Sequence, residues 1–191
     1  QGQFATTFSA DTSLKQLRHR CSCALCVAAR SASEFPRLES SEMGAWPVVR
    51  CYLVRHGDAL SAQVDAERPL SQRGRKEVAA LGQLALNRNV QVAEICHSGI
   101  RRAGETAEIL ASYLKPSRGV RQIAGLLPED DPALGKAEVE AVEQPILLVG
   151  HLPFMSRLAA LLVKGDAALS VAEFSPATML CCVKVGAKWQ I

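Results

Sequence analysis

Two histidines in the sequence stand in equivalent places, each just after a strongly apolar run. His56 closely follows the run Val48–Val54, and His151 closely follows the run Pro145–Val149. A neutral imidazole is a good nucleophile toward phosphorus near pH 7, because its reference pKa is about 6.5 and one ring nitrogen keeps a lone pair. A single histidine at the end of a strand is more often structural, but two in matching positions, each beside a glycine, favour a chemical role.

Arginines accompany these histidines. Arg55 directly precedes His56, and Arg101 and Arg102 follow a third strand-like run at Val92–Cys96. A guanidinium presents a planar fork of donors that matches phosphate oxygens. If the three runs are neighbours in one sheet, their polar exits meet at one edge. His56 could then attack a phosphoryl group to give a phosphohistidine that water hydrolyses, with no metal and no cofactor required.

The chain from residue 48 onward alternates strand and helix patterns, which is typical of an α/β layer fold. The continuous apolar run at Pro145–Val149 is typical of a parallel strand covered on both faces. The pattern predicts an α/β sandwich of three layers, α/β/α, with a mostly parallel central sheet and an antiparallel pair at one edge. The expected strands are Val48–Val54, Val92–Cys96, Val120–Ile123, Pro145–Val149, Thr178–Val185 and Lys188–Ile191, and the expected helices follow Ser71, span Ala103–Leu114 and Leu134–Val142, and follow Pro153.

The charge balance sets bounds on the partners. The 191 residues include 22 Lys plus Arg and 19 Asp plus Glu, so the net charge is +3. This excess is too small to favour a nucleic-acid or membrane partner, and no apolar run approaches the roughly 18 residues needed to span a bilayer. We expect a cytoplasmic protein that acts as a monomer, with no nucleic acid and no membrane among its partners.

The first 46 residues differ in character from the rest of the chain. They show no clear helical or strand period, so residues 1–46 are expected to be a disordered or non-native extension and residues 47–191 the folded domain. Met43 is a candidate start, and the alternative is an organellar transit peptide, since the segment is basic and rich in Ser.

The seven cysteines form no disulfide framework. Three of them, Cys21, Cys23 and Cys26, lie near His19 and could suggest zinc, but their spacing is unusual for a zinc site, so an accidental grouping is the preferred reading and no metal is expected. The four cysteines within apolar runs are expected to be buried reduced thiols.

Four motifs in order resemble the histidine phosphatase superfamily, whose fold is like that of phosphoglycerate mutase. They span residues 48–191 and are most similar to the small branch that includes bacterial phosphohistidine phosphatase. The motifs are Leu53-Val54-Arg55-His56-Gly57-Asp58-Ala59, Arg68-Pro69-Leu70-Ser71 with Gly74, Ser98 with Arg102-Ala103 and Thr106-Ala107, and Gly150-His151-Leu152-Pro153.

The resemblance implies a role for each matching residue. His56 would be the phosphorylated nucleophile, Arg55 and Arg102 would bind the phosphate, and His151 would complete the pocket as a charged donor. Arg102 is chosen over Arg101 because it precedes Ala103 and stands four residues before Thr106, as in the family pattern.

Two positions near these residues are less sharply defined by the resemblance. Gly57 and Asp58 are expected at the bound substrate, although Asp58 could equally fix Arg55 or His56, or simply serve a turn. The family usually has Ser-Pro or Ser-Ser where this chain has His97-Ser98-Gly99, which leaves the shape of that loop open.

The space available around the site bears on the substrate. Only about thirty residues separate Leu114 from Pro145, which leaves little room for a covering lid, and an open site suits a phosphorylated side chain on another protein. The favoured substrate is phosphohistidine in a protein, whose nitrogen leaving group needs little acid catalysis. The alternatives are a small phosphorylated metabolite, which would make the protein a phosphomonoesterase for a sugar phosphate or nucleotide, and a non-catalytic adaptor for phosphoproteins. The candidate acids are Glu129, Asp130 and Asp131, although an acidic turn between two prolines is more often only a solvated loop.

Overall fold

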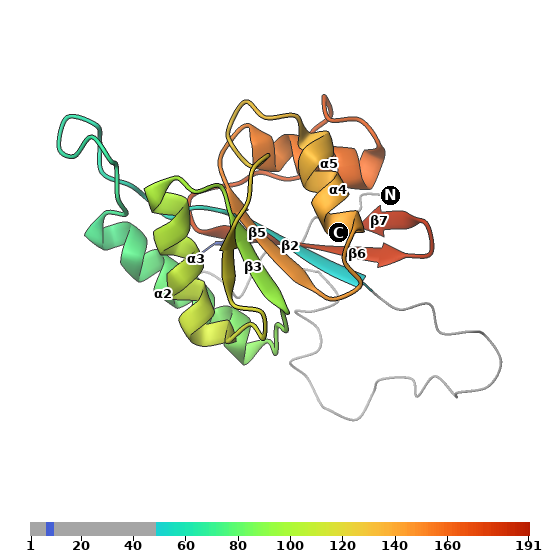
Figure 1. Ribbon diagram of the computed structural model, residues 1–191, viewed down its shortest axis with the longest axis horizontal. Coiled ribbons are helices and arrows are strands. Elements are labelled where there is room, and N and C mark those ends of the chain that lie inside the picture. The colour runs from blue at the N-terminus through green and yellow to red at the C-terminus, as the bar shows by residue number, and fades with distance from the viewer. Residues whose placement is uncertain (1–6, 10–48) are drawn as a thin grey trace, which may run out of the picture.

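The computed structural model describes residues 7–9 and 49–191, which form one sheet with helices on both faces (Figure 1). The strand order is β1-β6-β2-β5-β3-β4, and β7 pairs with β6. The strands are β1 (Thr7–Ser9), β2 (Val49–Arg55), β3 (Glu94–His97), β4 (Val120–Gln122), β5 (Ile146–Gly150), β6 (Thr178–Val185) and β7 (Lys188–Gln190). The helices are α2 (Gln72–Asn87), α3 (Arg101–Leu114), α4 (Pro132–Glu140) and α5 (Phe154–Lys164).

The central strands run in one direction. β5 lies between β2 and β3 and is parallel to both, and β3 is parallel to β4. Among the described strands only β6 runs against the rest, since it pairs antiparallel with β1, β2 and β7. All five residues of β5 are buried, as expected for a parallel strand covered on both sides. The carboxyl ends of β2, β5 and β3 therefore meet at one edge.

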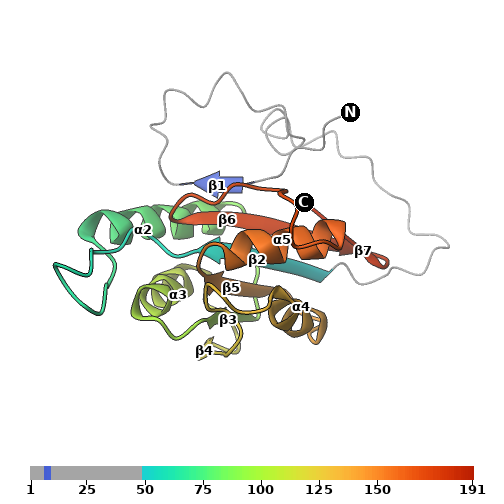
Figure 2. The same ribbon diagram turned by 90° about the horizontal axis from the view of Figure 1, so that it is seen from above.

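The helices form two layers, with α2 and α3 on one face of the sheet and α4 and α5 on the other (Figure 2). Alternating residues of each strand feed the two cores. Tyr52 and Val54 pack with α2 and α3, whereas Cys51 and Leu53 pack with α5. This alternation is the period of two expected for a strand buried on both sides, and it confirms the predicted three-layer sandwich.

Local signals fix the helix ends close to the predicted positions. Ser71 caps α2, and its hydroxyl oxygen accepts a hydrogen bond from the Gly74 amide at 2.9 Å. α3 ends at Lys115, which has a φ of 47° and immediately precedes Pro116. The elements differ from the predicted bounds by one or two residues at most ends, where periodicity is least informative.

The N-terminal segment differs from the prediction at one place. Thr7–Ser9 was expected to be part of an extension without structure, but it forms β1 and pairs with Thr178–Leu180 of β6. The edge of β6 that faces away from β2 offers unpaired backbone donors and acceptors, and the short strand β1 pairs with them. The cysteine group at residues 21–26 lies outside the described residues. The four cysteines that the structure describes are free thiols, and none of the described helices could cross a membrane.

Candidate active site

The register of two parallel strands brings the two histidines together. Arg55 at the end of β2 lies opposite Gly150 at the end of β5. The next residue along each chain is a histidine, and the ring centroids of His56 and His151 are 4.9 Å apart. The His56 amide also donates to the Gly150 carbonyl at 3.1 Å, which extends the ladder by one residue. The predicted meeting of the two strand exits is therefore present in the structure.

Two neighbours fix the protonation pattern of His56. Its Nδ1 lies 2.7 Å from the Gly57 carbonyl oxygen, which can only accept a hydrogen bond. Its Nε2 receives a hydrogen bond from Nε of Arg102 at 3.1 Å. The proton therefore resides on Nδ1 and the lone pair on Nε2. This lone pair faces the cationic side of the site, which is the arrangement that a nucleophilic imidazole needs.

The two arginines at the start of α3 have different partners. Arg102 donates to His56, whereas Arg101 forms an ion pair with Glu105, with 3.3 Å between Nε and the carboxylate. Glu105 also pairs with Arg75 and accepts the Leu70 amide, so this carboxylate is fully engaged by other groups. Among the described residues Arg102 forms no ion pair with a carboxylate, and it is the arginine of the two that faces the histidines.

Arg55 is held by the chain that leads into β6. Its Nη1 donates to the Phe174 carbonyl at 2.8 Å, while its buried Nε has no partner among the described residues. Burial lowers the pKa of Arg55 and of Arg102, because each guanidinium loses hydration without gaining a carboxylate. The two cations are thus positioned but electrostatically uncompensated.

His151 is 2 % exposed and contacts the loop that follows β3. Its Nε2 lies 2.7 Å from the Ser98 hydroxyl, and its Nδ1 is buried without a partner among the described residues. An orphaned lone pair is tolerated better than an orphaned N–H group. The proton is therefore better placed on Nε2, where it can be donated to Ser98 or to an anion in the same place.

Both rings are neutral at pH 7. Burial first, and then the positive charges of Arg102 and Arg55, lower the pKa of His56 to about 4. Burial, followed by His56 and the same two arginines, lowers the pKa of His151 to about 3. The sequence analysis expected a charged His151. The expectation is wrong for this set of residues, because desolvation and three basic neighbours oppose a further charge.

Gly57 and Asp58 lie at the site but are occupied with the fold. The Gly57 amide donates to the Thr106 hydroxyl at 3.2 Å, and a Cβ at this position would come within 2.6 Å of Val78 on α2. The Asp58 carboxylate accepts a hydrogen bond from the Ser71 hydroxyl at 2.6 Å. Of the alternatives for Asp58, the geometry matches the one in which it serves a local turn at the start of α2.

Two further residues reach the site and were not among the predicted site residues. Ser98 was noted only as part of a motif, and its hydroxyl bonds His151. Arg68 is exposed and has a φ of 47°, and its charge contributes to lowering the pKa of both His56 and Arg102. The motif Arg68-Pro69-Leu70-Ser71 carried the signal for Arg68, but nothing local indicated that its charge would act on the nucleophile.

The unusual loop after β3 has a defined shape. Gly99 has a φ of 84°, which L side chains rarely adopt, and a Cβ there would meet the side chain of Gln122. The Gly99 amide donates to Nδ1 of His97 at 3.1 Å. His97 thus stabilises the turn at Gly99, and Ser98 faces His151.

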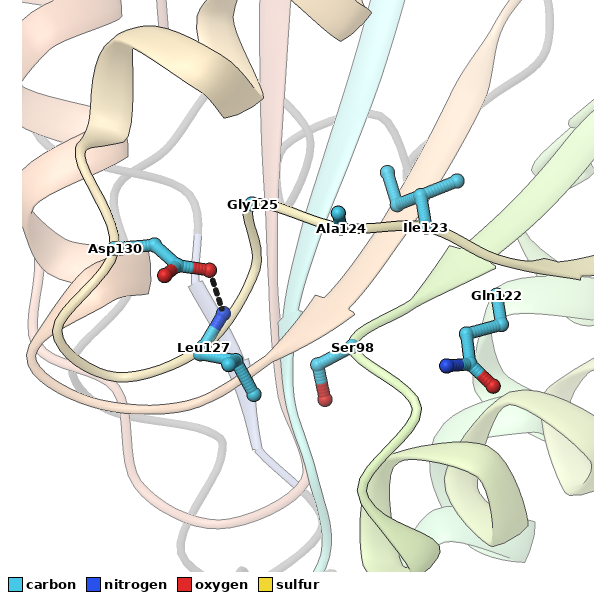
Figure 3. Close-up of a pocket in the computed structure, with 7 residues that line it drawn as sticks. All are labelled: Ser98, Gln122, Ile123, Ala124, Gly125, Leu127 and Asp130. Carbon is cyan, nitrogen blue, oxygen red and sulfur yellow. Dashed lines mark hydrogen bonds between the residues drawn. The ribbon is translucent and has the colours of Figure 1, made fainter.

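A cavity of about 440 Å³ begins at Ser98 and extends along the carboxyl ends of β3 and β4 (Figure 3). Of the three candidate acids, only Asp130 lines it. Its Oδ2 accepts the Leu127 amide at 2.8 Å, and Asp131 instead caps α4 through the Ala133 amide. Glu129 is exposed.

One group of potential metal ligands lies away from these histidines. Ligand atoms of Glu94, Cys96 and Glu138 lie within 4.8 Å of one another. Arg121 donates to both carboxylates, so a guanidinium already occupies the position a cation would take. This group is best described as an ion-pair network.

Comparisons with known proteins identify a matching family model and similar solved structures. Residues 51–126 match the family model described as histidine phosphatase superfamily (branch 1). This segment contains Arg55, His56 and Arg102, whereas His151 lies beyond it. No curated protein matches the chain significantly in sequence.

Solved structures share the fold. A structure described as the protein histidine phosphatase SixA complexed with tungstate is 24% identical, with a TM-score of 0.63 over 74% of this chain and 92% of that one. A putative phosphohistidine phosphatase SixA from Agrobacterium tumefaciens is 22% identical, with a TM-score of 0.63 over 76% and 95%. A mycobacterial glucosyl-3-phosphoglycerate phosphatase is 18% identical, with a TM-score of 0.57 over 74% and 96%. The sequence of residues 51–126 thus resembles the histidine phosphatase superfamily, and the chain shares its fold with these solved structures.

Proposed function

We propose that the protein is a phosphatase that hydrolyses phosphohistidine in a protein through a covalent intermediate on His56. The observation that carries the proposal is the lone pair on His56 Nε2, which accepts a hydrogen bond from Arg102 and lies in a ring whose pKa the charge of Arg55 also lowers. Arginines alone would suffice to bind a phosphate. A neutral imidazole whose unprotonated nitrogen faces the same cations supports attack on the bound phosphate.

The first step uses the arrangement directly. The His56 Nε2 lone pair attacks phosphorus, and the bond to the leaving atom breaks with its electron pair going to that atom. Before this attack Arg102 exchanges its hydrogen bond to Nε2 for one to a phosphoryl oxygen, which frees the nitrogen lone pair. Arg55 and the Nε2 proton of His151 bind the remaining oxygens, where negative charge is spread in the transition state.

The second step regenerates the enzyme. Water attacks phosphorus, the P–N bond to His56 breaks, and Nε2 recovers its lone pair while phosphate leaves. The depressed pKa of His56 favours this outcome, because a less basic imidazole is a better leaving group. It also keeps the ring in its neutral form at pH 7.

The short segment between α3 and β5 supports a protein substrate. The residues between α3 and β5 already form β4 and α4, and α4 packs against α5 in one of the two helical layers. Little chain remains in this segment to cover the site. Two of the matched structures are described as phosphohistidine phosphatases, although one is described as a sugar-phosphate phosphatase, which keeps a small-molecule phosphomonoesterase as the second candidate.

The decisive experiment compares substrates in the wild-type protein. We expect kcat/KM for a phosphohistidine protein to exceed that for a panel of sugar phosphates and nucleotides. A marked preference for esters would overturn the substrate assignment and favour the second candidate.

The role of His56 is tested by His56→Ala, which should abolish turnover of every substrate and the acid-labile phosphorylation of the wild-type chain. His97→Asn is a matched control, because an asparagine at this position can still accept the Gly99 amide. Normal turnover in His56→Ala would exclude the nucleophile, and binding of phosphoproteins without turnover by the wild type would favour the adaptor.

A further inference from the structure

The cavity beside Ser98 is the natural extension of the phosphoryl site. Ser98 lines this cavity and also bonds His151, whose ring contacts that of His56. A substrate with its phosphoryl group at His56 can therefore place the atoms next to phosphorus in this space. Its volume of about 440 Å³ lies within the range of small-ligand pockets.

The lining of the cavity indicates the kind of group that fits. Ile123, Ala124 and Leu127 contribute apolar surface, and Leu127 is 42% exposed at the rim. The polar side chains are Ser98, Gln122 and Asp130, as Figure 3 shows. None of the described residues that line it is Lys or Arg, so it offers no cation for a second phosphate. A flat ring with apolar faces and one N–H group matches such walls better than a polyhydroxylated sugar does.

Asp130 is held in a defined position. Its Oδ2 accepts the Leu127 amide, and its backbone carbonyl accepts a hydrogen bond from Arg157 on α5 at 3.5 Å. Its other carboxylate oxygen accepts no hydrogen bond from the described residues. Among the described residues that line the cavity, Asp130 is the only one with a carboxylate.

We infer that the cavity receives the imidazole ring of the phosphorylated histidine, and that Asp130 accepts a hydrogen bond from the ring nitrogen remote from phosphorus. The inference rests on the proposed function. In the first step His56 Nε2 forms its bond to phosphorus while the substrate P–N bond breaks, and the electron pair goes to the departing ring nitrogen. The substrate ring binds in its protonated form, with the proton on the nitrogen remote from phosphorus, and the carboxylate stabilises this form. When the P–N bond breaks, the ring therefore leaves as neutral imidazole rather than as an anion.

The test compares leaving groups in Asp130→Asn. The asparagine oxygen can still accept the Leu127 amide, so the loop is preserved, but the negative charge is lost. We expect kcat/KM to fall at least about tenfold for a phosphohistidine protein and for phosphoimidazole, as loss of a charge-assisted hydrogen bond implies. Turnover of p-nitrophenyl phosphate should change by less than about twofold, since its leaving group needs no proton.

Glu129→Gln is the matched control, because it removes the same charge from the exposed neighbour in the same loop. It should leave all three rates within about twofold of wild type. An equal loss of all three rates in Asp130→Asn, or no loss, would overturn the inference while the proposed function stood. If wild-type protein hydrolysed p-nitrophenyl phosphate but neither phosphohistidine nor phosphoimidazole, the proposed function itself would fail and the inference with it.

Discussion

Two charged clusters lie on this sheet, and they treat arginine in opposite ways. Around Arg121 the cation is matched by Glu94 and Glu138, and these carboxylates raise the pKa of the guanidinium. Around His56 the cations Arg55 and Arg102 are partly buried without a carboxylate, and burial lowers their pKa. The first cluster is electrostatically complete and the second is not.

The two clusters differ in how much a bound ligand could stabilise them. A completed network contributes to stability and leaves little for a ligand to improve. An uncompensated group of cations raises the free energy of the folded state, and an anion that binds there relieves it. Side chains that could ligate a metal gather around Arg121, but their charges are already paired. The unpaired positive charges lie beside the histidines and indicate the functional site.

The largest expected effect comes from removing an uncompensated cation. Arg102→Gln should lower kcat/KM by about 10² to 10³, as measured for single donors to developing negative charge, without lowering the free energy of unfolding. Steady-state kinetics and urea unfolding of the same preparations check both halves. Arg101→Gln is the matched control from the same helical turn, and since Arg101 pairs with Glu105 it should keep near-normal activity. Equal losses in the two variants would contradict the comparison.

A smaller effect is expected on the pH dependence of the free energy of unfolding, which differs between the two clusters. His56 and His151 titrate near pH 4 and pH 3 when folded and near pH 6.5 when unfolded, so the unfolded chain binds more protons between these values. Their stabilising contribution is complete above about pH 6.5 and is lost as the pH falls toward 4. Glu94, whose pKa Arg121 lowers, loses its contribution only below its ordinary value of 4.5.

Urea unfolding between pH 7 and pH 5 measures this window. The wild type should lose about 2 kcal/mol more than His56→Asn/His151→Asn, after allowance for solvent screening. His97 is present in both proteins and cancels. If the free energy of unfolding changed equally with pH in the two proteins, the prediction that both imidazoles are buried in their neutral form would be wrong.

The smallest effect comes from the completed cluster. Arg121→Gln should lower the free energy of unfolding by about 1 kcal/mol, because its side chain is 47% exposed and exposed ion pairs contribute little. The value of kcat/KM should remain within about twofold of wild type. Arg121→Lys should restore part of the stability. A large loss of activity with unchanged stability would reverse the roles assigned to the two clusters.

Much of the fold could be predicted because its signals are local. The apolar run before Gly150 predicts a doubly covered strand, and Ser71 predicts a helix start, and both are present. The convergence of the two strand exits at His56 and His151 was also predictable, because parallel neighbours end at one edge.

Other features depend on contacts between distant residues and carried no local signal. Thr7–Ser9 is too short to show a strand period, and only pairing with β6 makes it a strand. The neutral state of His151 follows from burial beside three basic groups. The engagement of Asp58 with Ser71 required knowledge of where α2 begins in space.

The alignment of Arg55 with Gly150 has a consequence for how the protein folds. Strands β2 and β5 are separated by nearly a hundred residues, and a slip of one residue between them would turn one imidazole toward the opposite helical layer. Partly assembled forms that lack this pairing are thus expected to be inert. The rate at which turnover recovers during refolding would therefore report the pairing of β5 with β2 rather than the collapse of the chain.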